Sequence, residues 1–114
     1  MSKQIGYVKH VNEDKANRIE FLLTNFDYFD GIDYLAKLFC EKYQMRADKK
    51  VEGIFFDFIT LHANDAEYIL MWHEDIGILI YSNHDNYNIT QLETQLSAVI
   101  QEINYRLRSD QFGG

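Results

Sequence analysis

The segment from Val51 to Ser82 constrains the fold more than any other part of the chain. It contains three runs rich in β-branched and aromatic residues, "VEGIFFDFITL", "AEYILMWH" and "IGILIYS". Such runs favour β-strands. The connections "HAND" and "ED" between them are short and polar, as in tight turns. Strands joined so closely pair with their neighbours, so the sequence predicts a three-stranded antiparallel meander.

The first of these runs has apolar side chains on both faces. Read as a continuous strand, it places Ile54, Phe56 and Phe58 on one face and Phe55, Asp57 and Ile59 on the other. A sheet with two largely apolar faces must be covered on at least one side. We therefore expect the other elements of the chain to pack on it.

Two segments outside the meander have helical periodicity. The first runs from Gly31 to Gln44, with Asp30 as the predicted N-cap and Asp33 in the first turn. The second runs from Ile89 to Arg108, and we expect residues 110–114 to be a frayed tail. One side of this second helix carries a continuous apolar stripe, formed by Leu92, Leu96, Val99, Ile100, Ile103 and Leu107. Residues 1–24 are ambiguous, because "IGYVKHV" fits a strand or an amphipathic turn, and "KANRIEFLL" fits a short helix or a helix that runs into a strand.

These elements predict an α+β fold in one compact domain spanning residues 1–114. The expected order is an N-terminal helix, the three-stranded antiparallel meander, and a long C-terminal helix packed on the sheet. The length of 114 residues suits a single domain, and 46% of the residues are hydrophobic, which is enough for a core.

The charge distribution restricts the kinds of partner. The formal net charge is −7, which disfavours binding to nucleic acids and anionic membranes, because both need clustered basic residues. From Val51 to Tyr105 there is no Lys or Arg. The same span contains nine acids: Glu52, Asp57, Asp65, Glu67, Glu74, Asp75, Asp85, Glu93 and Glu102. Such a span should attract cationic partners, although an acidic face can also serve solubility alone.

The sequence also predicts a cytoplasmic location. No apolar run reaches the roughly 20 residues that a membrane span requires. The N-terminal segment "MSKQIGYVKHVNEDK" is too polar for a secretory signal. Cys40 is the only cysteine and cannot form an internal disulfide. Its predicted place within a helix indicates a small core or boundary residue, because a catalytic thiol needs a basic, partly exposed setting.

No catalytic or metal-binding signature is recognisable, so we expect neither an enzyme nor a cofactor. Asp27, Asp30 and Asp33 recur every third residue, whereas a calcium loop needs oxygen ligands at alternating positions. The segment "WHEDIG" lacks the second histidine of a zinc protease motif. One alternative stays open: His62 and His84 could converge at one end of the sheet with Asp65 or Asp85, with His73 as a third member of a small active site.

The segments "YFDGIDYLAKLF", "GIFFDFITL" and "YILMWHEDIGILIYS", together with the acidic span, give the chain a family resemblance. It resembles the immunity proteins of bacterial toxin systems, including those of contact-dependent growth inhibition. The resemblance is one of type over most of the chain and contains no diagnostic motif. It implies tight binding to a cognate toxin domain, often a basic nuclease, whose active site is covered or distorted.

We expect carboxylates to pair with basic residues of the toxin while aromatic side chains fill the dry centre of the interface. The predicted partner-binding residues are Asp57, Glu67, Trp72, Glu74, Asp75 and Asp85, with Asp27, Tyr28 and Asp30 as a second patch. Trp72 could instead belong to the core. The alternative function is an acidic regulatory or assembly subunit that binds a non-toxin protein. A sheet face left uncovered would also allow a homodimer.

Overall fold

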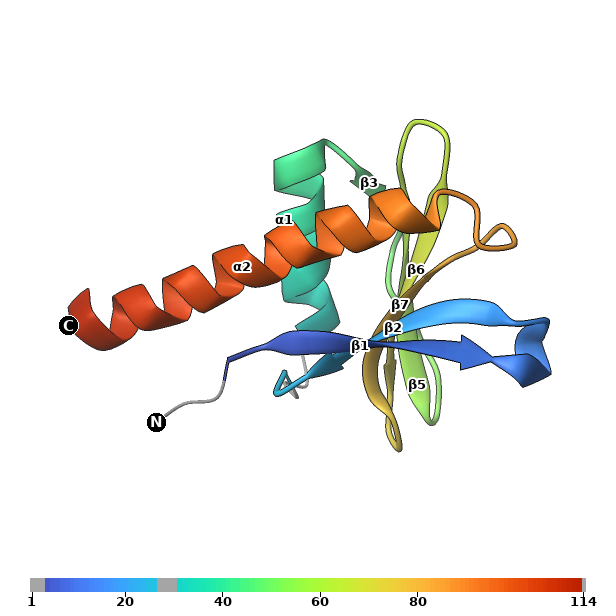
Figure 1. Ribbon diagram of the computed structural model, residues 1–114, viewed down its shortest axis with the longest axis horizontal. Helices are drawn as coiled ribbons and strands as arrows, with labels where there is room; N and C mark the ends of the chain where they lie inside the picture. Colours follow the sequence, from blue (N-terminus) through green and yellow to red (C-terminus); the bar gives the residue numbers. More distant parts are fainter. Residues whose placement is uncertain (1–3, 27–30, 114) are drawn as a thin grey trace.

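The protein is an α+β fold in which two helices pack on one face of an antiparallel sheet (Figure 1). The computed structural model describes residues 4–26 and 31–113, with side chains up to residue 107. The elements are β1 (Gly6–Asn12), the 3-10 turn η1 (Glu13–Lys15), β2 (Arg18–Thr24), α1 (Gly31–Tyr43), β3 (Arg46–Ala47), β4 (Val51–Glu52), β5 (Phe56–His62), β6 (Glu67–His73), β7 (Gly77–Ser82) and α2 (Ile89–Gly113). Within the described residues, no helix is long and apolar enough to cross a membrane.

The predicted arrangement of helix, meander and helix is wrong. Two strands precede α1, and the sheet has seven strands in the order β1-β2-β7-β6-β5-β3, with β4 also paired to β5. The first two strands form a hairpin whose register runs from Gly6 opposite Thr24 to Asn12 opposite Arg18. The hairpin joins the sheet through β2, which lies antiparallel to β7. The meander therefore forms only part of a wider sheet.

The turn of the β1–β2 hairpin explains why residues 1–24 were ambiguous. It contains no glycine or proline, the usual markers of a turn. The chain reverses through η1, and Ala16 and Asn17 then adopt the left-handed conformation, with φ of 56° and 62°. Left-handed Asn is common in turns, whereas left-handed Ala is rare.

The meander itself consists of β5, β6 and β7, all antiparallel. The predicted strand that began at Val51 is wrong in one respect, because the chain turns back between β4 and β5. The amide of Gly53 donates a hydrogen bond to the carbonyl of Phe56 at 2.7 Å, which closes this turn. A Cβ at Gly53 would lie 2.8 Å from the same carbonyl oxygen, so the close approach requires glycine.

The main core lies between the helices and one face of the sheet. The sheet contributes Phe21, Ile59, Leu61, Leu70, Ile78 and Ile80, while α1 contributes Ile32, Leu35, Leu38 and Phe39. The predicted stripe of α2 is buried in this core at Leu92, Leu96, Val99, Ile100 and Ile103. Leu107, the last member of the stripe, is 36% exposed. We call this side of the sheet the helix face.

The other side of the sheet, which we call the open face, carries a second and smaller apolar cluster. Ile69, Leu79 and Tyr81 are buried there, and Leu22, Phe58 and Met71 pack around them. Neither α1 nor α2 contributes to this cluster, so the described helices leave the open face uncovered. The expectation that the sheet is covered on at least one side is confirmed, and the open face becomes the main candidate for function.

Candidate protein interface

A row of apolar side chains crosses the open face from one strand to the next. The strand registers align one residue from each of six strands, and we call this row the apolar stripe: Val8, Leu22, Leu79, Met71, Phe58 and Val51. Residues directly opposite each other on neighbouring strands point to the same face. The stripe is therefore one continuous row of apolar side chains that spans the sheet from β1 to β4.

The two ends of the apolar stripe are exposed to solvent, and Leu22, Met71 and Phe58 are partly exposed. Val8 is 53% exposed and Val51 is 47% exposed at its two ends, while Leu79 at the centre is only 3% exposed. Phe56 is 37% exposed and stacks on Phe58, with ring centroids 6.2 Å apart. Extended apolar surfaces of this kind on a folded domain mark sites of interaction with another molecule.

A second exposed apolar group lies at the end of the sheet where β5 begins and β6 ends. Ile54 is 88% exposed and Phe55 is 60% exposed in the β4–β5 turn, and Ile76 is 53% exposed in the β6–β7 turn. The amide of Glu74 donates a hydrogen bond to the carbonyl of Phe55 at 2.9 Å, which holds the two turns together. Glu74 and Asp75 are also exposed. We call these five residues the tip.

The structure places four of the predicted partner-binding residues at or beside the tip. Glu74 and Asp75 belong to it, while Asp57 and Trp72 form a cross-strand pair between β5 and β6. Trp72 is partly buried and packs against the core on the helix face, as in the alternative core assignment. Asp57 is half-buried. Asp27, Tyr28 and Asp30 lie outside the described residues.

Asp57 contributes to a local acidic environment near the start of β4. The carboxylate of Asp33 accepts a hydrogen bond from the Lys50 ammonium at 2.9 Å, and this bond is the largest of the effects that raise the pKa of Lys50. The negative charges of Glu52 and Asp57 raise the pKa of Lys50 further. The Lys50 ammonium is therefore already paired with a carboxylate of α1.

The other two predicted residues, Glu67 and Asp85, lie at the opposite end of the sheet. Glu67 begins β6, whereas Glu74 and Asp75 follow its last residue. Asp85 lies in the loop between β7 and α2. The structure therefore brings Asp57, Trp72, Glu74 and Asp75 into one region and separates them from Glu67 and Asp85.

His62 and His84 do converge, but on Glu67 rather than on Asp65 or Asp85. The ring of His62 lies 3.3 Å from the Glu67 carboxylate, and the ring of His84 lies 3.5 Å from it. The other ring nitrogen of His62 lies 2.8 Å from Asp48, and this hydrogen bond is the main reason that the pKa of Asp48 is lowered. His73 is at the far end of β6, so the three histidines do not form one site.

Among the residues with described positions, no group of three or more His, Cys, Asp or Glu side chains is arranged so that it could hold a metal ion.

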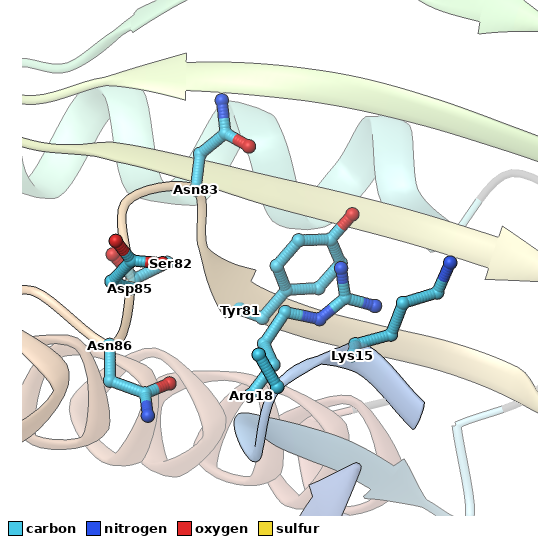
Figure 2. Close-up of a pocket in the computed structure, with 8 residues that line it drawn as sticks. Lys15, Arg18, Tyr81, Ser82, Asn83, Asp85 and Asn86 are labelled. Carbon is cyan, nitrogen blue, oxygen red and sulfur yellow. The ribbon is translucent and has the colours of Figure 1, made fainter. Parts of the chain in front are cut away.

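A polar hollow of about 410 Å³ lies near the turn of the β1–β2 hairpin (Figure 2). Arg18 is one of its lining residues, and the Arg18 guanidinium lies 3.6 Å above the centre of the Tyr81 ring. Nε of Arg18 donates a hydrogen bond to the buried carboxylate of Glu20 at 3.0 Å. Burial raises the pKa of Tyr81, and the positive charge of Arg18 acts in the opposite direction.

Sequence reasoning missed both the apolar stripe and this hollow. Arg18 and Glu20 are two residues apart, so they share a face only if the segment is a strand. The sequence pattern does not identify residues 18–24 as a strand, so it cannot show which of their side chains lie on the same face of the sheet. The alternation of Phe56 and Phe58 was visible, but its continuation through Met71, Leu79, Leu22 and Val8 requires the strand registers.

Comparison of the chain with models of protein families, with curated proteins and with solved structures finds no match.

Proposed function

We propose that this protein works by stoichiometric binding to a cationic protein partner, and that the partner is the toxin domain of a toxin–immunity pair. The observation that carries the binding proposal is the apolar stripe on the open face, which crosses six strands without a covering helix. A face of this kind loses its exposure to water only when another molecule covers it.

The tip supplies the features expected at the centre and rim of an interface. Ile54 and Phe55 project apolar surface that can enter a pocket on the partner, and buried anchors of this type dominate binding energy. Glu74 and Asp75 beside them are exposed carboxylates that can pair with basic side chains. The span from Val51 to Tyr105 adds no positive charge that would oppose a cationic partner.

The assignment to toxin immunity rests on the resemblance in size, acidity and aromatic content, and it extends the binding proposal to a biological role. In this role the chain acts in the cytoplasm, where the basic toxin domain would otherwise act on the cell. Binding over the toxin's active site would neutralise it without any reaction, so no catalytic group is needed on the immunity side.

The test uses, as the candidate toxin, the protein encoded by the gene next to the gene for this chain. Phe55→Asp should weaken its binding by roughly 30-fold or more, since hot-spot truncations typically cost about 2 kcal/mol or more. Tyr105→Asp is the matched control, because Tyr105 is 66% exposed on α2, away from the open face. Isothermal titration calorimetry gives both affinities, and circular dichroism checks that both variants are folded.

Equal binding by the two variants would contradict the assignment of the tip to the interface. Protection of growing cells against the toxin, measured in the same variants, then tests the biological role. Binding without protection would favour the alternative function, a regulatory or assembly subunit.

A further inference from the structure

The hollow near the β1–β2 turn adjoins the apolar stripe on the open face, because its lining residue Tyr81 belongs to the same cluster as Leu79, but it is distant from the tip. It lies at the end of β7 marked by Ser82, whereas the tip is next to Gly77 at the other end. Its volume of about 410 Å³ falls within the range of small-molecule sites, roughly 300–1,000 Å³. Two loops and two strands line it, through Lys15, Ala16, Arg18, Tyr81, Ser82, Asn83, Asp85 and Asn86.

Arg18 is held in place before any ligand arrives. Its guanidinium lies on the Tyr81 ring, and its Nε and Nη2 atoms donate hydrogen bonds to Glu20, which is only 6% exposed. Asn12 donates a further hydrogen bond to the same Glu20 oxygen at 3.2 Å. These bonds to Glu20 do not involve Nη1 of Arg18. Because the side chain is already ordered, a ligand that binds it loses less free energy to conformational ordering.

Lys15 adds a second positive charge on the same side of the hollow (Figure 2). It is exposed and forms no ion pair with any residue that the structure describes. The charge of Arg18 is already compensated by Glu20, so Lys15 is the lining cation that attracts an anion into the hollow. Glu13 and Asp14 belong to the same turn as Lys15, but they are not among the residues that line the hollow.

Asp85 lies on the opposite side of the hollow from Lys15 and Arg18 (Figure 2). Its carboxylate accepts no hydrogen bond and forms no ion pair within the part of the chain that the structure describes. Asn86 fixes this side to the hairpin, because its Oδ1 accepts a hydrogen bond from the amide of Ile19 at 2.8 Å and its Nδ2 donates one to the carbonyl of Asn17 at 3.2 Å.

Four residues around the hollow have a left-handed backbone, which is unusual for alanine. Ala16, Asn17, Asp85 and Asn86 all have positive φ, between 45° and 62°. Residues in this conformation persist where the surrounding structure holds them, and they concentrate at functional sites. These residues lie beside the charged groups of the hollow, with Lys15 and the Glu20-paired Arg18 on one side and Asp85 on the other (Figure 2).

From this arrangement we infer that the hollow binds a small zwitterion of the α-amino acid class. The carboxylate of the ligand lies between Lys15 and Nη1 of Arg18, and its ammonium group pairs with Asp85. An anion without a positive group would be repelled by Asp85, and a cation without a negative group would be repelled by Lys15, whose charge no carboxylate of the described residues compensates. This inference does not depend on the proposed function, because the binding of a small zwitterion requires no protein partner.

The test is an NMR titration of the isotopically labelled protein with glycine, acetate or methylammonium at constant ionic strength. We expect glycine alone to give saturable shifts of the amides that line the hollow. Lys15→Gln and Asp85→Asn should each weaken glycine binding by about ten-fold, since each removes one charge-assisted contact. Both side chains are exposed, so neither change affects the core. Lys9→Gln and Asp65→Asn, which lie outside the hollow, are the matched controls.

Failure of glycine to saturate would overturn the inference, as would acetate binding as tightly as glycine. Glycine binding that is unchanged in both Lys15→Gln and Asp85→Asn would place the ligand elsewhere and would also overturn it. The titration needs no protein partner, so its outcome is independent of whether the tip binds a toxin.

Discussion

At the scale of single residues, Asp48 links two strands through its carboxylate. One oxygen accepts a hydrogen bond from Arg46 at 2.8 Å, and the other lies 2.8 Å from Nε2 of His62. The hydrogen bond with His62 is the main cause of the lowered pKa of Asp48. We expect His62→Ala to raise the pKa of Asp48 toward its ordinary value, as measured by carbon-13 NMR titration of the carboxyl group.

The sign of the pH dependence follows from this direction. A carboxylate whose pKa is lowered by folding stabilises the native state above its unfolded pKa, and it loses that contribution as the pH falls through the folded pKa. The His62→Ala variant should therefore lose less stability than the parent over the acidic range where Asp48 titrates. His73→Ala, at the other end of β6, is the control. An unchanged Asp48 pKa in His62→Ala would show that the contact does not persist in solution.

The Cys40 thiol should react slowly with disulfide reagents. Burial is the largest effect on its pKa and raises it, and a backbone hydrogen bond with Ala47 acts in the opposite direction. Because the thiolate is the reactive form, we expect Cys40 to react with a disulfide reagent more slowly than free glutathione at pH 8. Denaturant should remove the difference. A native-state rate equal to that of glutathione would contradict the partly buried position of Cys40.

At the scale of secondary-structure elements, α2 depends on its buried stripe. Leu96 is fully buried between α2 and the helix face of the sheet. Leu96→Ala should lower the free energy of unfolding by about 2–5 kcal/mol, because the change removes apolar contacts and leaves a cavity. Urea denaturation measures this loss. Gln91→Ala, an exposed position on the same helix, should change stability by less than about 0.5 kcal/mol.

The elements that could be predicted are those with strong local signals. The helix from Gly31 ends at Tyr43, one residue before the predicted end, and α2 begins at the predicted Ile89. The three strands of the meander follow from their β-branched and aromatic residues. The β1–β2 hairpin could not be predicted, because its turn uses left-handed Ala16 and Asn17 in place of glycine. The end of α2 was also missed, since the helix continues past Arg108 to Gly113.

At the scale of the whole molecule, the acidic span should steer a cationic partner toward the protein, and this attraction should depend on salt. Raising the salt concentration from about 0.05 to 0.5 M shortens the screening length from roughly 14 to 4 Å. We expect association with the cationic partner to slow by about ten-fold, with a smaller effect on dissociation. Stopped-flow fluorescence measures both rates.

A charge-neutralising pair of variants refines this prediction. Glu74→Gln combined with Asp75→Asn should reproduce part of the loss at low salt, because both residues belong to the tip. Asp85→Asn, at the other end of the sheet, should have a smaller effect. Association that is independent of salt and unchanged in the double variant would exclude the acids of the tip from recognition.

The candidate interface was predictable in its charge but not in its shape. The acidic span can be read directly from the sequence. The apolar stripe depends on Leu22 lying opposite Leu79, a pairing between residues far apart in the chain. Trp72 illustrates the same limit, because only the strand register shows that it faces the helices.

The pairing of β2 with β7 also has a consequence for how the chain folds. The β1–β2 hairpin and the β5–β7 meander each form from contacts between sequence neighbours, whereas the junction between them joins Leu22 to Leu79. Closing so long a loop costs conformational entropy before the contact is made. The hairpin and the meander should therefore each form early, and the docking of one on the other should limit the folding rate.

Only three residue pairs form the junction between β2 and β7, so native-state hydrogen exchange should reveal the hairpin opening as a unit before the meander does.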